Sequence, residues 1–133
     1  MLYELLGFIN VALIVALTAP YWLRMINKVV FKNKNKEIVK LIKPLRKLHK
    51  PMGLTILVLA PLHGYLALGG LRPHTGSLVG IMATITIILG GSYFFTKKKA
   101  IFKWHKMAAL ITVILLAVHL LFPSALYTLF KIY

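Results

Sequence analysis

Four long stretches without a charged residue constrain the fold of this chain more than any other feature. They occupy residues 5–23, 51–71, 73–96 and 107–130. Each is close to the roughly 20 apolar residues that cross the hydrocarbon core of a bilayer as a helix. Because a backbone in lipid must satisfy its own hydrogen bonds, such segments fold as helices. The sequence predicts an all-α, integral membrane four-helix bundle, a single transmembrane domain over residues 1–133 with spans at about 5–23, 51–71, 76–96 and 107–130.

The positive charges lie beside these stretches. The chain has 17 Lys and Arg residues against 2 Asp and Glu, a formal net charge of +15. Ten of the basic residues lie between Arg24 and Lys50, five lie between Lys97 and Lys106, and only Arg72 and Lys131 lie at the opposite ends of the spans. Short loops rich in Lys and Arg stay cytoplasmic. We therefore expect a multi-pass plasma-membrane protein with both termini outside, whose partner is the lipid bilayer and not nucleic acid.

The first basic connection has a helical pattern of its own. Its apolar residues recur at helical spacing and alternate with lysines, at Ile38, Leu41, Ile42, Leu45 and Leu48. This pattern predicts an amphipathic cytoplasmic segment at about residues 33–48 that lies in the headgroup layer against anionic lipid. A docking surface for a partner is the alternative. Pro44 is expected to break or kink the segment before the second span.

Composition excludes several kinds of chemistry. The chain has no cysteine, which excludes disulfides, thiolate metal sites and covalently attached haem. Glu4 and Glu37 are the only acidic residues, so neither a carboxylate dyad nor a carboxylate proton relay is available. No glycine-rich dinucleotide fingerprint follows a strand. Any metal in this chain must be held by histidine or oxygen.

Histidines carry the strongest chemical signal. Four of the five form two pairs with the same fourteen-residue spacing, His49 with His63 and His105 with His119. On a helix, fourteen residues fall about 40° short of four turns and rise roughly 21 Å, so both members of a pair face the same way. The second and fourth spans run parallel in the predicted topology. His49 should therefore lie level with His105 near the inner surface, and His63 level with His119 nearer the outside.

Two imidazoles facing each other across parallel helices suit the axial positions of a haem iron. A bis-histidine iron has no open position for oxygen or substrate, which favours electron transfer. The pattern predicts two haem b groups between the second and fourth spans, about 20 Å apart. Gly53 and Ala109, one turn after the inner histidines, leave room for a porphyrin ring. Ile56 and Thr112, at the midpoints of the two spacings, are expected to pack between the haems.

Basic residues near both levels are expected to neutralise the haem propionates. Lys50 and Lys106, with Lys47 and Lys103, lie beside the inner pair, and Arg72 follows the outer end of the second span. The lysines also serve as topology signals. His74 has no partner at a matching spacing. It is expected to be an ordinary loop residue, with a contribution to an acceptor site as the alternative.

At these histidines the sequence resembles a known architecture. His49-Lys50-x-x-Gly53 with His63-Gly64, and more loosely His105-Lys106 with His119-Leu120, is similar to the dihaem transmembrane core of ferric reductases and NADPH oxidases and to that of respiratory cytochrome b. The match covers about residues 47–122. The resemblance implies that His49 and His105 bind the inner haem, and His63 and His119 the outer one. A flavin and nicotinamide domain and recognisable quinone-site motifs are both missing from the sequence.

The expected function is transmembrane electron transfer by a dihaem b-type cytochrome. The donor would be a cytoplasmic-side protein or a quinol, and the acceptor would be ferric iron or a partner cytochrome at the outer face. The chain would act alone or as a subunit of a larger redox complex, and whether it is itself an oxidoreductase stays open. The alternative is a redox-silent membrane transporter or anchor subunit whose histidines bind a divalent metal.

Overall fold

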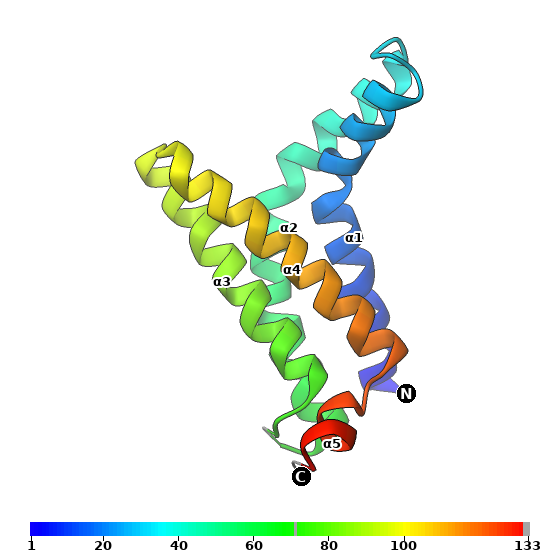
Figure 1. Cartoon of the computed structure of the whole chain (residues 1–133), viewed down its shortest axis with the longest axis vertical. Helices are drawn as coiled ribbons and strands as arrows, with labels where there is room; N and C mark the ends of the chain where they lie inside the picture. The colour runs from blue at the N-terminus through cyan, green and yellow to red at the C-terminus, as the bar shows by residue number, and fades with distance from the viewer. Residues whose placement is uncertain (71, 132–133) are drawn as a thin grey trace.

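The computed structural model of this chain describes residues 1–70 and 72–131, and all secondary structure within them is helical. The helices are, in chain order, α1 (Leu2–Val29), α2 (Lys36–Leu68), α3 (Thr75–Thr96), α4 (Lys99–Leu121) and α5 (Ala125–Phe130) (Figure 1). The first four are long and apolar enough to cross a membrane. This arrangement confirms the prediction of an all-α chain with four candidate spans, as expected for a multi-pass membrane protein.

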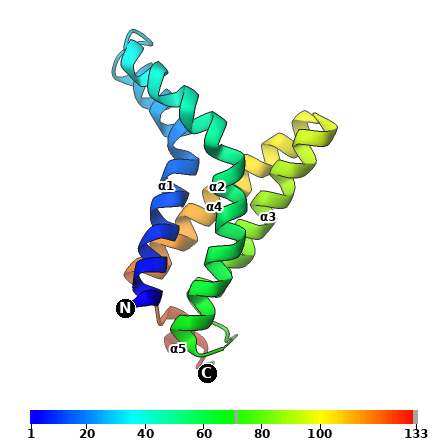
Figure 2. The same cartoon turned by 180° about the vertical axis from the view of Figure 1, so that it is seen from behind.

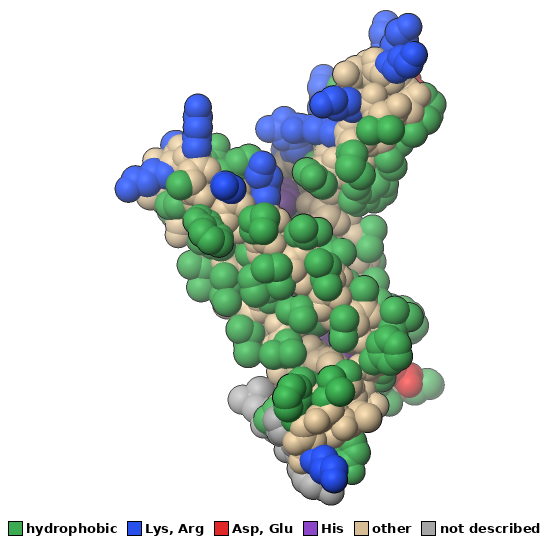
Figure 3. All heavy atoms as spheres, viewed as in Figure 1, with side chains coloured by type: hydrophobic (Ala, Val, Ile, Leu, Met, Phe, Trp, Pro, Cys, Tyr) green, Lys and Arg blue, Asp and Glu red, His purple; other side chains and the backbone are tan. Residues whose placement is uncertain are grey.

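The four long helices form two hairpins. Helix α1 packs mainly against α2, and α3 mainly against α4, while the hairpins contact each other chiefly through α2 and α3. Both chain termini lie at one end of the molecule, and the hairpins diverge into two arms at the other end (Figures 1 and 2). Lys and Arg side chains gather at the tips of these arms (Figure 3). The fold thus separates a basic end from the end that carries the termini.

Two helix boundaries differ from the expected spans. Helix α2 begins at Lys36, where the side chain of Asn35 accepts hydrogen bonds from the next turn, and it continues through Pro44 to Leu68. Of the break or kink expected at Pro44, the break is wrong, because the amphipathic segment and the second span form one helix. Helix α4 ends at Leu121, well before the expected end at residue 130. Pro123 explains this end, since a proline disfavours helical geometry in the residue before it.

The core lies at mid-height, where all four long helices meet. It consists of Ile14, Ile56, Val79, Ala83 and Leu116. Ile56 is only 2% exposed, and Thr112 is buried with its hydroxyl 3.2 Å from that of Thr86 on α3. Ile56 and Thr112 are the midpoints of the two histidine spacings, so the chain is closely packed between the two histidine levels.

Asn27 holds the connection between α1 and α2. Its buried side-chain amide donates to the carbonyl oxygen of Asn35 at 3.3 Å and accepts from the backbone N–H of Asn35 at 3.2 Å. We expect Asn27→Ala to lower the free energy of unfolding by about 1–3 kcal/mol, because both backbone groups lose their partner. Unfolding in mixed detergent measures the effect. Lys34→Ala, at an exposed side chain in the same connection, serves as the control, and an equal loss in both variants would contradict this role.

Candidate functional site

The structure brings the predicted inner pair together. His49 on α2 and His105 on α4 have ring centroids 6.1 Å apart, with ring planes at 76°. Metal–imidazole bonds of about 2.0–2.1 Å, with roughly 1 Å more from each nitrogen to its ring centre, place two imidazoles on opposite sides of one metal about 6 Å apart. The spacing of these two rings therefore matches that of two axial ligands. Histidine side chains are visible at the base of the hollow between the basic arms (Figure 3).

The outer histidines are arranged differently. In the described structure no ring contact joins His63 to His119, although the two lie close enough for their charges to interact. The ring in contact with His119 is that of His74, with centroids 5.5 Å apart and planes at 85°. The outer level thus contains three histidines, where the sequence predicted a pair.

Two of the predicted ligands donate their Nδ1 hydrogen to the backbone of a neighbouring helix. Nδ1 of His63 lies 2.7 Å from the carbonyl oxygen of Tyr3 on α1, and Nδ1 of His105 lies 2.9 Å from that of Thr86 on α3. A carbonyl oxygen can only accept, so the hydrogen of each neutral ring is on Nδ1. The Nε2 atom of each ring then keeps its lone pair for a metal. Metal-bound histidines in proteins are typically oriented in this way.

The hydroxyl of Thr75 fixes the same tautomer in His119. Its single hydrogen is donated to the carbonyl oxygen of Pro123 at 2.7 Å. Nδ1 of His119, 2.9 Å from this hydroxyl oxygen, must therefore be the donor of the second hydrogen bond. Thr75 is only 4% exposed, which shields both bonds from water. Nε2 of His119 is left with a free lone pair, as in His63 and His105.

His74 has the opposite tautomer. Its Nδ1 accepts a hydrogen bond from the backbone N–H of Gly76 at 3.3 Å, which caps the beginning of α3. The hydrogen of the neutral ring is then on Nε2, and this ring has no free lone pair to offer while it caps the helix. His74 therefore has a local structural role beside His119, close to the ordinary loop role predicted for it.

Three glycines hold the histidine rings close to a neighbouring helix. A Cβ atom on Gly90 would lie 3.0 Å from Cε1 of His105, and one on Gly76 would lie 3.1 Å from Cε1 of His119. A Cβ atom on Gly7 would likewise lie 3.0 Å from Cε1 of His63. Each ring occupies space that a methyl group at the glycine would take. None of these three glycines is among the site residues predicted from the sequence.

The two hairpins share part of this arrangement. His49 lies near the backbone of Leu17 on α1, and His105 donates to the carbonyl oxygen of Thr86 on α3 at 2.9 Å. The matching positions of the first and second hairpins are Gly7 and Gly76, Leu17 and Thr86, His49 and His105, and His63 and His119. The glycine precedes the carbonyl residue by ten residues in both hairpins. Because any residue type supplies a carbonyl, this spacing can be recognised only once the contacts of the histidines are known.

The other predicted site residues lie around the histidines. Gly53 is half-buried, and a Cβ atom there would meet nothing within 4 Å, so open space adjoins α2 one turn from His49. Ala109 is half-buried on α4. At the basic end, the ammonium of Lys50 lies 3.3 Å from the centre of the Phe94 ring, and that of Lys106 lies 5.1 Å from the centre of the Phe102 ring. Arg72 is exposed in the connection before α3.

The inner pair offers two imidazoles, the number that a haem iron takes as protein ligands. Within residues 1–70 and 72–131, no group of three or more His, Cys, Asp or Glu side chains could hold a metal ion. A divalent cation needs several protein ligands, whereas a porphyrin supplies four nitrogens itself and takes two imidazoles. No family model, curated protein or solved structure matches the chain.

Proposed function

We propose that this chain is a dihaem b-type membrane cytochrome that transfers electrons across the bilayer. The observation that carries the proposal is the inner pair, with two imidazoles from parallel helices at a centroid distance of 6.1 Å. The tautomers of His63, His105 and His119 support it, because each ring has its Nε2 lone pair free.

The histidines of α2 and α4 have defined roles in this proposal. His49 and His105 would hold the haem at the inner level, and His63 and His119 would hold the one at the outer level. Bound haem b supplies a reversible one-electron carrier whose iron has no open coordination position. The carbonyl of Thr86 and the hydroxyl of Thr75 hold the His105 and His119 rings in their ligand orientation.

The two levels span much of the membrane. Fourteen residues of helix rise roughly 21 Å, against a hydrocarbon core of about 30 Å. One level therefore lies toward each leaflet, and side chains of the core fill the space between them. Electrons cross the bilayer by moving between the two levels.

The charge distribution orients the relay. By the positive-inside rule the basic arms face the cytoplasm and both termini face outward. The donor is then a cytoplasmic-side protein or a membrane quinol, and the acceptor at the outer face is ferric iron or a partner cytochrome. In this proposal Lys50 and Lys106 would neutralise propionates at the inner level, and Arg72 would do so at the outer level.

Purified protein tests this function directly. We expect two haem b groups per chain, a clear difference between dithionite-reduced and air-oxidised spectra, and no binding of carbon monoxide by the reduced form, because both axial positions are taken. Pyridine haemochrome analysis against protein concentration gives the ratio. Protein that stays colourless after haem supplementation would exclude the cytochrome and favour the redox-silent transporter or anchor. Strong carbon monoxide binding would exclude bis-histidine ligation.

A further inference from the structure

A separate cleft lies between α1 and α2 at the basic end of the molecule. Its volume is about 750 Å³, within the roughly 300–1,000 Å³ of typical ligand pockets. Its basic lining residues are Arg24, Lys28, Lys43, Arg46 and Lys47. None of the five histidines lines it, so this cleft is distinct from the proposed haem sites.

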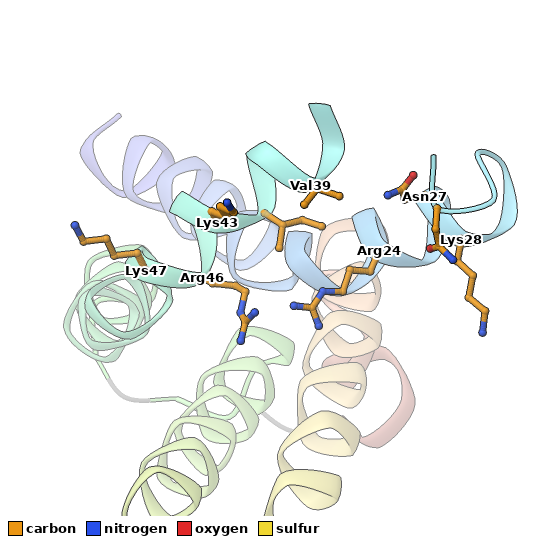
Figure 4. Close-up of a pocket in the computed structure, with 9 residues that line it drawn as sticks. Arg24, Asn27, Lys28, Val39, Lys43, Arg46 and Lys47 are labelled. Carbon is orange, nitrogen blue, oxygen red and sulfur yellow. The ribbon is translucent and has the colours of Figure 1, made fainter. Parts of the chain in front are cut away.

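Two arginines converge in this cleft. Arg24 extends from α1 and Arg46 from α2, and their guanidinium groups point toward one another (Figure 4). Neither acidic residue of the chain lies between them. Glu4 interacts with the N-terminal amine at 3.4 Å, and Glu37 with the ammonium of Lys40 at 2.7 Å. Two facing positive charges repel each other unless an anion lies between them. The cleft therefore has no counter-charge from the protein, and a bound anion would supply one.

The chemistry of the lining indicates the kind of anion. A guanidinium donates two parallel hydrogen bonds to phosphate oxygens, which a lysine ammonium cannot do. The polar side chains of Asn27 and Asn33 and the apolar ones of Val39 and Ile42 also line the cleft. Arg24 directly follows the uncharged stretch of α1, which places the cleft where a spanning helix leaves the hydrocarbon core. A lipid whose headgroup lies at this level would have its acyl chains in the hydrocarbon core beside α1 and α2.

We infer that this cleft binds the headgroup phosphate of an anionic phospholipid. Basic clefts between spanning helices on the cytoplasmic side bind such headgroups in other membrane proteins. Free phosphate carries the same anionic chemistry but has no acyl chains to lie along α1 and α2. The lipid would link the ends of these two helices through Arg24 and Arg46.

Native mass spectrometry of the full chain in neutral detergent tests the inference. Titration with phosphatidylglycerol and with phosphatidylcholine of the same acyl chains should give preferential phosphatidylglycerol adducts. The double variant Arg24→Gln and Arg46→Gln should weaken phosphatidylglycerol binding roughly tenfold to hundredfold, since charge-assisted hydrogen bonds are lost. The double variant Arg24→Lys and Arg46→Lys keeps the charge but loses the paired donors. Its affinity for phosphatidylglycerol should lie between that of the native chain and that of the glutamine pair.

A matched control separates a site from a general charge effect. Lys98→Gln with Lys99→Gln removes the same charge from the other basic arm and should leave phosphatidylglycerol binding unchanged. Equal weakening in the two Gln pairs would overturn the inference, as would equal binding of the two lipids by the native chain. Displacement of phosphatidylglycerol by inorganic phosphate would assign the cleft to a soluble anion. If the arginine-to-glutamine pair fails to fold, the lysine pair and the lipid comparison decide the question.

Discussion

Replacing His119 by alanine is expected to remove one of the two haems and to leave the other bound. The variant loses the Nε2 ligand of the outer level, and the imidazole of His63 alone is left to hold that iron. His49 and His105 lie roughly 21 Å away along their helices, beyond the packed core, so their geometry is unchanged. Since each haem takes two histidines, the ratio of haem to protein should fall from about two to about one. Pyridine haemochrome analysis of the purified variant measures it.

His74→Ala is the matched control for this substitution. The His74 ring lies closer to His119 than any other ring does, yet its Nδ1 accepts a hydrogen bond from Gly76 and leaves no lone pair for iron. We expect this variant to keep both haems and to lose only the helix cap, at a cost of about 1 kcal/mol. Loss of a haem in His74→Ala would make His74 the outer ligand. Loss of both haems in His119→Ala would contradict two independent levels.

Gly90→Ala is expected to weaken haem binding at the inner level alone. The new Cβ would lie 3.0 Å from Cε1 and 3.1 Å from Nδ1 of His105, so the ring must move by a few tenths of an ångström. This movement disturbs both its hydrogen bond to Thr86 and its alignment with His49. Loss of such an orienting contact typically costs tenfold to a hundredfold in metal affinity, and we expect roughly that loss here. The affinity of the inner level is measured by titrating the apoprotein with haem and following the inner-haem signal in electron paramagnetic resonance.

Gly91→Ala provides the control at the next residue of α3. A Cβ atom there would meet nothing within 4 Å, and the substitution changes helix propensity by the same amount. This variant should bind both haems as the native chain does. Equal weakening in the two variants would mean that the glycines act through the stability of α3 and not through the position of the His105 ring.

The sequence predicted the spans well because uncharged length is a direct physical requirement for crossing a bilayer. It could not decide between a break and a kink at Pro44, and it misplaced the helix end near Pro123. A proline within a helix removes one hydrogen bond but does not always end the helix, so the continuity of α2 depends on packing against α1. At the end of α4, the uncharged stretch continues beyond Pro123, and hydropathy alone could not locate the turn.

The histidine site was predictable in part. The inner pairing of His49 with His105 follows from spacing and topology, since both helices run in the same direction. The contact of His74 with His119 depends on how the chain turns before α3, which no spacing in the sequence specifies. The backbone acceptors at Tyr3 and Thr86 were also missed, because any residue type supplies a carbonyl. Their positions depend on how α1 and α3 are rotated about their axes.

The division into two hairpins that diverge at the basic end has a consequence for biogenesis. Each hairpin buries its own helix pair, so the two can enter the bilayer one after the other without waiting for partners. His49 and His105 belong to different hairpins, so this histidine pair forms only after both have been translated and have met. On the proposed function, haem would be captured there late in maturation, and a ribosome stalled after the first hairpin would yield an inserted product that lacks the pair.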